Sequence, residues 1–429
     1  MHILYNIILF GAAVIIAPYY LCKIIFAGKY RKSILQKLGG RQSEILSGLK
    51  KAPRVWIHAV SVGEVTAAAP IVASLKKKKP EVEIIFSTST ETGQDMAKKF
   101  INDASAFIYF PLDIPAVVNK VIKMALPDVF VPVETELWPN FLGACKKHGV
   151  KMLMVNGRIS PRSYRRYLLT GFLWKRVLGT LDFAGMISGI DAQRLVRIGM
   201  DSTKIKVMGN AKYDGLASMV SSDLKEEISN RCNVLADEKF FVAGSTHPGE
   251  DEIVINVYKR LLDRYPDFKL ILVPRHIERT HDITGLLNQS GFDDVIKLSD
   301  IDKGRKRDKE RIIVVDVIGE LFKVYSLATL VYCGGSLVPK GGQNILEAAA
   351  WGKVIFYGPS MDDFSQEKTL LEEAGCGITV RNEEELYQGM IRMLDKPEEL
   401  VSLGENGKAV VLANIGASER YADLISKYV

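Results

Sequence analysis

The sequence predicts an α/β protein with two doubly wound domains of similar size that face a cleft, preceded by an N-terminal membrane-anchor helix. Short apolar runs rich in β-branched residues alternate with amphipathic helical runs, which is typical of a parallel sheet with right-handed crossovers. The alternation pauses near residues 205–225 and then begins again. A chain of 429 residues has room for two or three domains.

An uncharged run predicts the anchor. Residues 3–22 carry no charge, and at 1.5 Å per residue this length just spans a hydrocarbon core of about 30 Å. Lys23, Lys29 and Arg31 follow the run, so the positive-inside rule places the body of the protein on the cytoplasmic side. A cleaved signal peptide and a helix embedded only partly in the bilayer are the alternatives.

The alternating runs follow one another along both halves. The strand-like runs of the first half are residues 54–60, 82–89, 127–134 and 151–157, separated by helical runs at 63–80, 91–100 and 138–149. The second series comprises residues 239–266, 269–276, 312–328, 330–335 and 354–359. We expect the anchor at 1–28, the first domain at 29–213 and the second at 214–429, with room for the last helix to pack back on the first domain. Ligands of such sheets bind beyond the carboxyl ends of the strands.

Charge and motifs narrow the possible functions. A net charge of +7 suits an anionic partner such as phosphate, nucleic acid or an acidic membrane, and does not choose among them. Neither a GxxxxGKS/T loop nor a GxGxxG fingerprint is present, which argues against a P-loop NTPase or an NAD enzyme. The five cysteines form no CxxC pair and no cluster with histidine, so neither disulfides nor a zinc site are predicted.

Carboxylates follow two strands of the first domain. Glu64 comes just after Gly63, where a strand ends and a helix begins, and is the candidate general base; capping that helix is its alternative role. Glu134 and Glu136 would point to opposite sides of a continuing strand, so at most one of them needs to face the cleft. His58 is expected to be a core histidine satisfied by hydrogen bonds.

Basic residues follow the next strand. Arg158, Arg162 and Arg165 would suit an acceptor that bears phosphates, although a solvated basic loop has the same composition. Lys212, in "MGNAKYD", lies at the predicted junction of the domains and is expected to face the cleft.

Small and polar residues end the strands of the second domain. Ser245 and Thr246 precede a helix whose free N–H groups suit a phosphate, with an ordinary capping box as the alternative. Arg275 offers a planar fork to a phosphate or a base edge, or makes a surface ion pair. Gly319 and Glu320 mark another strand-to-helix turn.

The strongest signal of the second domain is the stretch 332–359. Its glycine pairs, at 334–335 and 341–342, permit close approach of the backbone to a ligand. Asn344 and Glu347 share a helix face, where a carboxylate could accept both hydroxyls of a ribose. We interpret this stretch as a binding site.

Taken together and in this order, the motifs resemble those of the bacterial 3-deoxy-D-manno-octulosonic acid (Kdo) transferases of lipopolysaccharide assembly. The matching stretches are "HAVSVGEV", "VETELWPN", "NGRIS", "GNAKYD", "GSTHPGE", "LVPRH", "IGELF" and "GGSLVPKGGQNILEAA". The resemblance covers nearly the whole chain. One departure is Gln343, where many relatives have histidine.

The resemblance implies a GT-B glycosyltransferase fold, in which the first Rossmann-like domain binds the acceptor and the second binds the donor. The implied reaction is an inverting transfer of Kdo from CMP-Kdo to a phosphorylated lipid A precursor at the cytoplasmic face of the inner membrane. CMP-Kdo is a co-substrate, and no metal, cofactor, nucleic acid or protein partner is expected.

The resemblance also implies roles for individual residues. Glu64 is the implied base, and Glu134 and Lys212 support the transition state. The residues implied in CMP binding are Pro274, Arg275, Ile318, Gly319, Glu320, Asn344, Ile345, Leu346 and Glu347. Two other hypotheses remain open: a GT-B transferase or epimerase that uses a UDP-sugar, and a non-catalytic, membrane-tethered phospholipid-binding protein.

Overall fold

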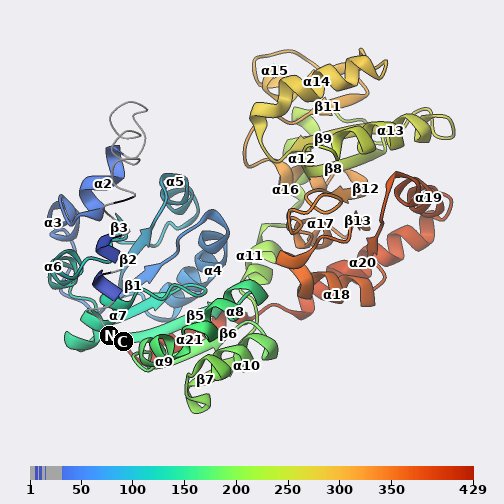
Figure 1. Ribbon diagram of the computed structural model, residues 1–429. Helices are drawn as coiled ribbons and strands as arrows, with labels where there is room; N and C mark the ends of the chain where they lie inside the picture. The colour runs from blue at the N-terminus through green and yellow to red at the C-terminus, as the bar shows by residue number, and fades with distance from the viewer. Residues whose placement is uncertain (1–4, 8, 12–14, 16–30) are drawn as a thin grey trace. The chain divides into compact units, whose positions relative to one another are not determined.

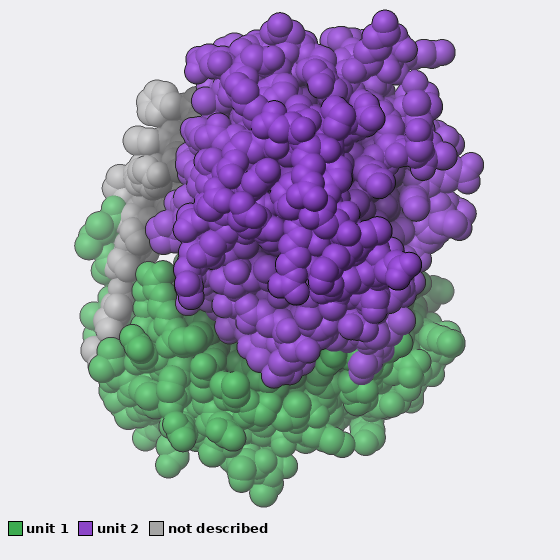
Figure 2. All heavy atoms as spheres, turned by 90° about the vertical axis from the view of Figure 1, so that its right-hand side faces the viewer, with its two compact units in different colours: residues 1–215, 414–429 green, residues 216–413 purple. Residues whose placement is uncertain are grey.

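The computed structural model describes residues 5–7, 9–11, 15 and 31–429, and the chain divides into two compact units. Unit 1 comprises residues 1–215 and 414–429, and unit 2 comprises residues 216–413; Figure 2 shows them in different colours. The sequence places the boundary after residue 213, and the structural division falls after Gly215. The predicted cleft between the domains stays a prediction.

Unit 1 contains a seven-stranded parallel sheet with the strand order β3-β2-β1-β4-β5-β6-β7. The strands are β1 (Arg54–His58), β2 (Glu83–Thr88), β3 (Ala106–Tyr109), β4 (Val129–Pro132), β5 (Lys151–Gly157), β6 (Phe183–Met186) and β7 (Ile205–Val207). The order reverses between β1 and β4, and such a switch point is where ligands of doubly wound sheets bind.

Helices precede, join and follow the strands of unit 1. They are α2 (Arg31–Lys37), α3 (Gln42–Leu46), α4 (Val62–Lys78), α5 (Glu91–Phe100), α6 (Pro115–Ala125), α7 (Pro139–Lys147), α8 (Pro161–Leu169), α9 (Gly171–Leu178), α10 (Gly189–Ile198), α11 (Lys212–Met219) and α21 (Ala417–Ser426). The last of these, α21, lies among the elements of unit 1 at the red end of the chain (Figure 1).

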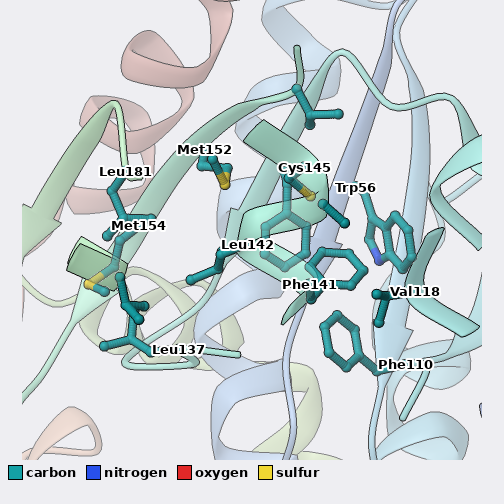
Figure 3. Packing of buried hydrophobic residues seen from close by; sticks show 14 of the residues in the cluster. Trp56, Phe110, Val118, Leu137, Phe141, Leu142, Cys145, Met152, Met154 and Leu181 are labelled. Atoms are coloured by element: carbon teal, nitrogen blue, oxygen red, sulfur yellow. The ribbon is translucent and has the colours of Figure 1, made fainter. Parts of the chain in front are cut away.

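Both faces of the unit 1 sheet are buried, as in other parallel sheets. Successive residues of β1 therefore enter two different cores: Trp56 one, and Val55 and Ile57 the other. The Trp56 ring makes an edge contact with Phe141 at 5.1 Å between centroids, and Figure 3 shows the two side by side. Phe110 also packs edge-on against Trp56. This core holds β1, and hence the residues that follow it, in a fixed position.

The C-terminal helix α21 completes unit 1 and packs chiefly on α4. The hydroxyl of Tyr421, a fully buried side chain, donates to the carbonyl of Gly209 at 2.8 Å. Asp214 accepts hydrogen bonds from the backbone N–H groups of Gly416 and Ser418. The end of the chain thus braces the segment that leads into α11.

Unit 2 contains a second seven-stranded parallel sheet, with the order β10-β11-β9-β8-β12-β13-β14. Its strands are β8 (Phe240–Thr246), β9 (Lys269–Pro274), β10 (Val295–Lys297), β11 (Ile312–Val314), β12 (Ala328–Cys333), β13 (Ile355–Tyr357) and β14 (Gly377–Thr379). Its helices are α12 (Ser222–Arg231), α13 (Asp251–Leu262), α14 (Thr280–Gln289), α15 (Leu298–Asp302), α16 (Leu321–Tyr325), α17 (Leu346–Ala350), α18 (Ser365–Glu373), α19 (Glu383–Leu394) and α20 (Pro397–Ala413). The predicted pair of parallel α/β domains is confirmed.

The predicted N-terminal anchor, residues 1–28, falls largely outside the described residues. Where its residues are described, the Tyr5 hydroxyl donates to Asp113 at 2.8 Å, and the side-chain amides of Asn6 and Asn140 hydrogen-bond to each other. Among the helices that the structure describes, none has the length and apolar character needed to cross a membrane.

Candidate active site

Glu64 lies in the first turn of α4, at the switch point of the unit 1 sheet. Ser61 is extended and precedes the helix, whose apolar residues recur every three or four positions and are buried: Val65, Ala68, Ile71, Val72 and Leu75. The Glu64 carboxylate accepts hydrogen bonds from the Val60 N–H at 2.6 Å and from the Ser61 hydroxyl at 3.1 Å. Ser61 and Gly63 are exposed, and a Cβ on Gly63 would meet nothing within 4 Å. Glu64 therefore both closes the start of the helix and borders open space.

The loop after β4 brings a second carboxylate to the same edge of the sheet. Glu134 has a left-handed backbone (φ 61°), and its N–H donates to the carbonyl of Val155 at 2.9 Å. Its carboxylate forms an ion pair with Lys212 at 2.9 Å. β4 ends at Pro132, so Glu134 and Glu136 do not lie on a continuing strand. The prediction that their side chains point to opposite sides assumed such a strand, and that assumption is wrong.

Two asparagines position Lys212. Asn156, which has a left-handed backbone at the end of β5, accepts a hydrogen bond from the Ala211 N–H at 2.9 Å. The side chain of Asn210 accepts from the Lys212 N–H at 3.0 Å. The ammonium group is thereby held beside Glu134, although 78 residues separate the two in the chain.

Glu64, Glu134, Glu136 and Lys212 form an acidic centre, in which burial is the main cause of the raised pKa values of Glu64 and Glu136. Burial raises the pKa of Glu64 to about 7; the charge of Glu134 adds to the rise, while the hydrogen bonds from Val60 and Ser61 and the charge of Lys212 oppose it. Burial likewise raises the pKa of Glu136 to about 8, and the charge of Glu64 adds to that rise. A carboxyl whose pKa lies near neutrality suits proton transfer.

His58 lies in the core below this centre. Its Nδ1 lies 3.1 Å from the carbonyl and 3.0 Å from the hydroxyl of Ser87, and its ring stacks on Phe110 at 3.8 Å. Burial lowers the pKa of His58 to about 3, so the ring is neutral. Its Nε2 has no hydrogen-bond partner among the described residues, so only half of the expected hydrogen bonding is present.

The predicted arginines lie around the start of α8. Arg158 precedes the helix and its carbonyl accepts a hydrogen bond from the Thr135 hydroxyl, which ties it to the loop that carries Glu134. Arg162 and Arg165 are exposed on α8, none of whose residues is buried. Their role in acceptor binding stays a prediction.

In unit 2, several predicted donor-binding residues lie beyond the carboxyl ends of the strands. Pro274 ends β9 and Arg275, directly after it, is exposed. Ile345 and Leu346 are buried at the start of α17, and the Asn344 amide donates to Glu347 at 3.0 Å. Burial raises the pKa of Glu347 to about 7, against the hydrogen bond from Asn344 and the charge of Arg275. The positive charge of Arg275 thus acts on Glu347 by lowering its pKa.

The other predicted turn of unit 2 exposes an apolar side chain. Ile318 is 77% exposed, and Gly319, with φ 91°, has open space where a Cβ would stand. Glu320 forms ion pairs with Arg231 at 3.0 Å and Lys323 at 3.5 Å. A backbone contact to a ligand at Gly319 is compatible with this arrangement, whereas the Glu320 carboxylate already has cationic partners.

Sequence reasoning missed a buried carboxylate at the switch point of the unit 2 sheet. Glu250 is fully buried, and its carboxylate accepts hydrogen bonds from one hydroxyl and four backbone N–H groups. The donors are Tyr332 (2.7 Å), Gly335 (2.7 Å), Ser336 (3.0 Å), Leu337 (3.0 Å) and His247 (3.0 Å). Such a ring of N–H groups is typical of an anion site, and here the protein's own carboxylate occupies it. Ser245 and Thr246 lie beside it with buried side chains, and phosphate binding by them stays a prediction.

The glycine pairs of unit 2 have a structural reason that the sequence did not reveal. A Cβ on Gly334 would collide with the carbonyl of Ser245, and one on Gly342 with the sulfur of Met361. Gly335 and Gly342 also have positive φ angles, 67° and 81°. The glycine pairs are therefore required by the fold itself, and their use in ligand binding stays a prediction.

A further contact links Gln343, which directly follows the second glycine pair, to His247 at the end of β8. Gln343 and His247 approach to 3.4 Å between their Nε2 atoms, and His276 packs edge-on against His247. Gln343, the departure from the family pattern, thus lies beside His247. Among the described residues, no group of three or more His, Cys, Asp and Glu side chains could hold a metal ion.

Several known proteins are similar to this chain in sequence. Residues 32–215 match the family model described as 3-Deoxy-D-manno-octulosonic-acid transferase (kdotransferase). The chain is 30% identical over 377 residues to the 3-deoxy-D-manno-octulosonic acid transferase of Haemophilus influenzae, and the match covers 87% of each chain. It is 34% identical over 406 residues to a bifunctional glycosyltransferase/methyltransferase of Fusobacterium nucleatum; this match covers 92% of the chain but 62% of that relative.

Solved structures resemble the chain in fold. A UDP-N-acetylglucosamine 2-epimerase matches with a TM-score of 0.62 at 15% identity, covering 89% of this chain and 97% of the epimerase. At this identity the likeness concerns the fold alone. The similarity to the Haemophilus influenzae enzyme extends over both units, so the chain belongs to the 3-deoxy-D-manno-octulosonic acid transferase family.

Proposed function

We propose that this protein transfers Kdo from CMP-Kdo to a phosphorylated lipid A precursor, with Glu64 as the general base. The observation that carries the proposal is the setting of Glu64: a half-buried carboxyl with a pKa raised to about 7, at the switch point of the sheet and beside the Glu134–Lys212 ion pair. Family membership supports the reaction class.

The transfer follows from these positions. The ionised Glu64 removes the proton of an acceptor hydroxyl, whose oxygen forms a bond to the anomeric carbon of Kdo. The bond between that carbon and the CMP phosphate oxygen breaks, and the electron pair leaves with CMP. We expect inversion at the anomeric carbon, because attack and departure occur on opposite faces.

Cationic groups complement the charge of this reaction. Lys212, held by Glu134, would stabilise negative charge near the acceptor, and Arg275 would bind the phosphate or the Kdo carboxylate of the donor. In unit 2, Asn344 and Glu347 would hold the ribose, and the N–H groups of the 318–320 turn would meet the cytosine. Ile345, Leu346 and Pro274 would complete the donor site.

The base assignment is tested with Glu64→Gln and Glu64→Ala, measured by release of CMP in the presence of CMP-Kdo and acceptor. Because a positioned base contributes about 10²–10⁴-fold to the rate, both variants should lose at least that much. Glu81→Gln, an exposed carboxyl of the same unit, is the matched control. Circular dichroism and thermal unfolding establish that the variants are folded. Full activity of Glu64→Gln would contradict the assignment.

A donor panel tests the reaction class. Turnover with CMP-Kdo and none with UDP-sugars is the expected result. The opposite pattern would favour the UDP-sugar alternative, whose fold this chain shares. Mass spectrometry of the product reports how many Kdo residues are added.

We also infer that the protein works at the cytoplasmic face of the inner membrane, held there by residues 1–28. An exposed apolar and cationic tip on α8 and α9 supports a membrane-facing acceptor site. Leu169 and Phe172 are 84% and 71% exposed, and Tyr167 packs edge-on against Trp174 to join the two helices. Exposed cations border the tip: Arg162, Arg165, Arg166, Lys175 and Arg176. Apolar residues ringed by cations are typical of surfaces that bind anionic lipid.

Vesicle sedimentation tests the membrane proposal. The protein should bind vesicles that contain anionic phospholipid more strongly than neutral ones, and Leu169→Asp with Phe172→Asp should weaken that binding. Leu126→Asp, at an exposed leucine elsewhere in unit 1, is the control. Equal binding by the double variant and the control would refute a membrane role for the tip.

A further inference from the structure

The acidic centre of unit 1 contains more carboxylates than cations. Glu64 comes from the start of α4, and Glu134 and Glu136 come from the loop after β4. Lys212 forms an ion pair with Glu134. If all three carboxyls were ionised, the three glutamates and Lys212 together would have a net charge of −2. Carboxylates that share a partly buried site do not all ionise together, so one of them retains a proton.

The geometry identifies Glu136 as that carboxyl. Glu134 has the ammonium of Lys212, and Glu64 accepts two hydrogen bonds that favour its charged form. Among the described residues, Glu136 has a single donor, the indole Nε1 of Trp138, at 2.9 Å from one carboxyl oxygen.

Within the part of the chain that the structure describes, the groups that act on the pKa of Glu136 are acidic or neutral. The charges of Glu64 and Glu134 both disfavour its ionisation, and only the hydrogen bond from Trp138 favours it. Tyr167 of α8 also interacts with Glu136: burial raises the pKa of the Tyr167 phenol, and the charge of Glu136 raises it further. Glu136 is only partly buried, so a substrate can reach it.

The pKa values of the two carboxyls agree with this assignment. The pKa of Glu64 is raised to about 7 and that of Glu136 to about 8. Two hydrogen bonds and the charge of Lys212 oppose the rise for Glu64, whereas a single hydrogen bond opposes the rise for Glu136, so Glu64 ionises at lower pH than Glu136. The base and a neutral acid therefore coexist at the same edge of the sheet.

We propose that Glu136 is a further substrate-contacting residue, which acts as a neutral carboxylic acid and donates a hydrogen bond to an anionic oxygen of the acceptor. This inference rests on the proposed function. An ionised Glu136 would repel an acceptor that bears phosphate, whereas the protonated form binds it. The same proton lets Glu64 hold its negative charge beside Glu136.

Replacing Glu136 by glutamine, its neutral isostere, tests the proposal. Glu136→Gln keeps a donor and cannot ionise, whereas Glu136→Ala has no donor. We expect Glu136→Gln to retain most of the transfer activity and Glu136→Ala to lose on the order of 10²-fold, as for removal of one hydrogen-bond donor from a catalytic site. Glu81→Gln is the control, and circular dichroism checks folding of each variant.

The pH profile of kcat/KM gives a signature that a structural role would not produce. The wild-type profile should be bell-shaped, rising near pH 7 as Glu64 ionises and falling near pH 8 as Glu136 ionises. In Glu136→Gln the fall should disappear while the rise remains. An unchanged fall in Glu136→Gln, or activity as low as that of Glu136→Ala, would overturn the proposal.

A spectroscopic measurement separates this inference from the proposed reaction. Infrared difference spectra between pH 7 and pH 9 should show loss of carboxylic acid carbonyl absorption, to which Glu64 and Glu347 also contribute, and one band of the wild type should be absent in Glu136→Gln. If the band is present but CMP-Kdo is not turned over, the proposed function fails and the protonated Glu136 stands. If turnover occurs and the band is identical in both proteins, the inference about Glu136 fails.

Discussion

Replacing Glu250 by alanine would remove the carboxylate that accepts five hydrogen bonds at the switch point of the unit 2 sheet. The donors come from the ends of β8 and β12 and from the turn that follows β12. Four of the five are backbone N–H groups, so no rotation of a side chain could give them new partners. We expect Glu250→Ala to destabilise unit 2 severely.

The size of the effect follows from the number of bonds. A hydrogen bond to a charged group contributes about 1.5–3 kcal/mol, so five of them sum to about 8–15 kcal/mol, which is similar to the total stability of a domain. Water that enters the space left by the side chain would replace part of this. We therefore expect a loss of at least about 3–5 kcal/mol, because each buried donor left without a partner costs about 1–3 kcal/mol.

Urea unfolding measures the loss of stability. Hydrogen exchange followed by mass spectrometry shows where in the chain the loss occurs. Exchange should accelerate in peptides of unit 2, above all in β8 and β12, and much less in unit 1. Glu252→Ala, an exposed carboxyl two residues along the chain, is the control and should change stability by less than about 0.5 kcal/mol. If Glu250→Ala behaved like Glu252→Ala, the carboxylate would not hold the β8 and β12 ends together.

Three further predictions concern the charges around Glu64 and the second glycine pair of unit 2. Glu134→Gln removes a charge that raises the pKa of Glu64, so the acid limb of the transfer profile should move to lower pH; the shift stays smaller than the whole rise from 4.5 to about 7, because burial is the main cause. Lys212→Met removes an opposing charge and should move that limb to higher pH; movement of both variants in one direction would contradict this account. Gly342→Ala should destabilise unit 2 in urea unfolding by more than Gly304→Ala, because both have positive φ but only Gly342 also meets Met361; equal losses would show that the clash is relieved.

Much of the candidate site could be predicted because its residues lie in short motifs. The position of Glu64 after a strand and a glycine indicated a carboxylate at a sheet edge, and the structure places it at the switch point. The relation between Glu134 and Glu136 could not be predicted, because it depends on where β4 ends. That end is decided by the left-handed turn at Glu134, and by the hydrogen bond from its N–H to β5.

By itself, the sequence determined the two α/β domains and the family and named the candidate site residues, because periodicity, turn residues and motif order are local properties of the chain. Only the tertiary structure decided which side chains meet. Glu250 and Tyr332, 82 positions apart, and Glu134 and Lys212, 78 apart, are paired by the order of strands in each sheet. The proton affinities of Glu64 and Glu136 are likewise tertiary properties, because burial and neighbouring charge, which raise them, arise only once the strands are assembled.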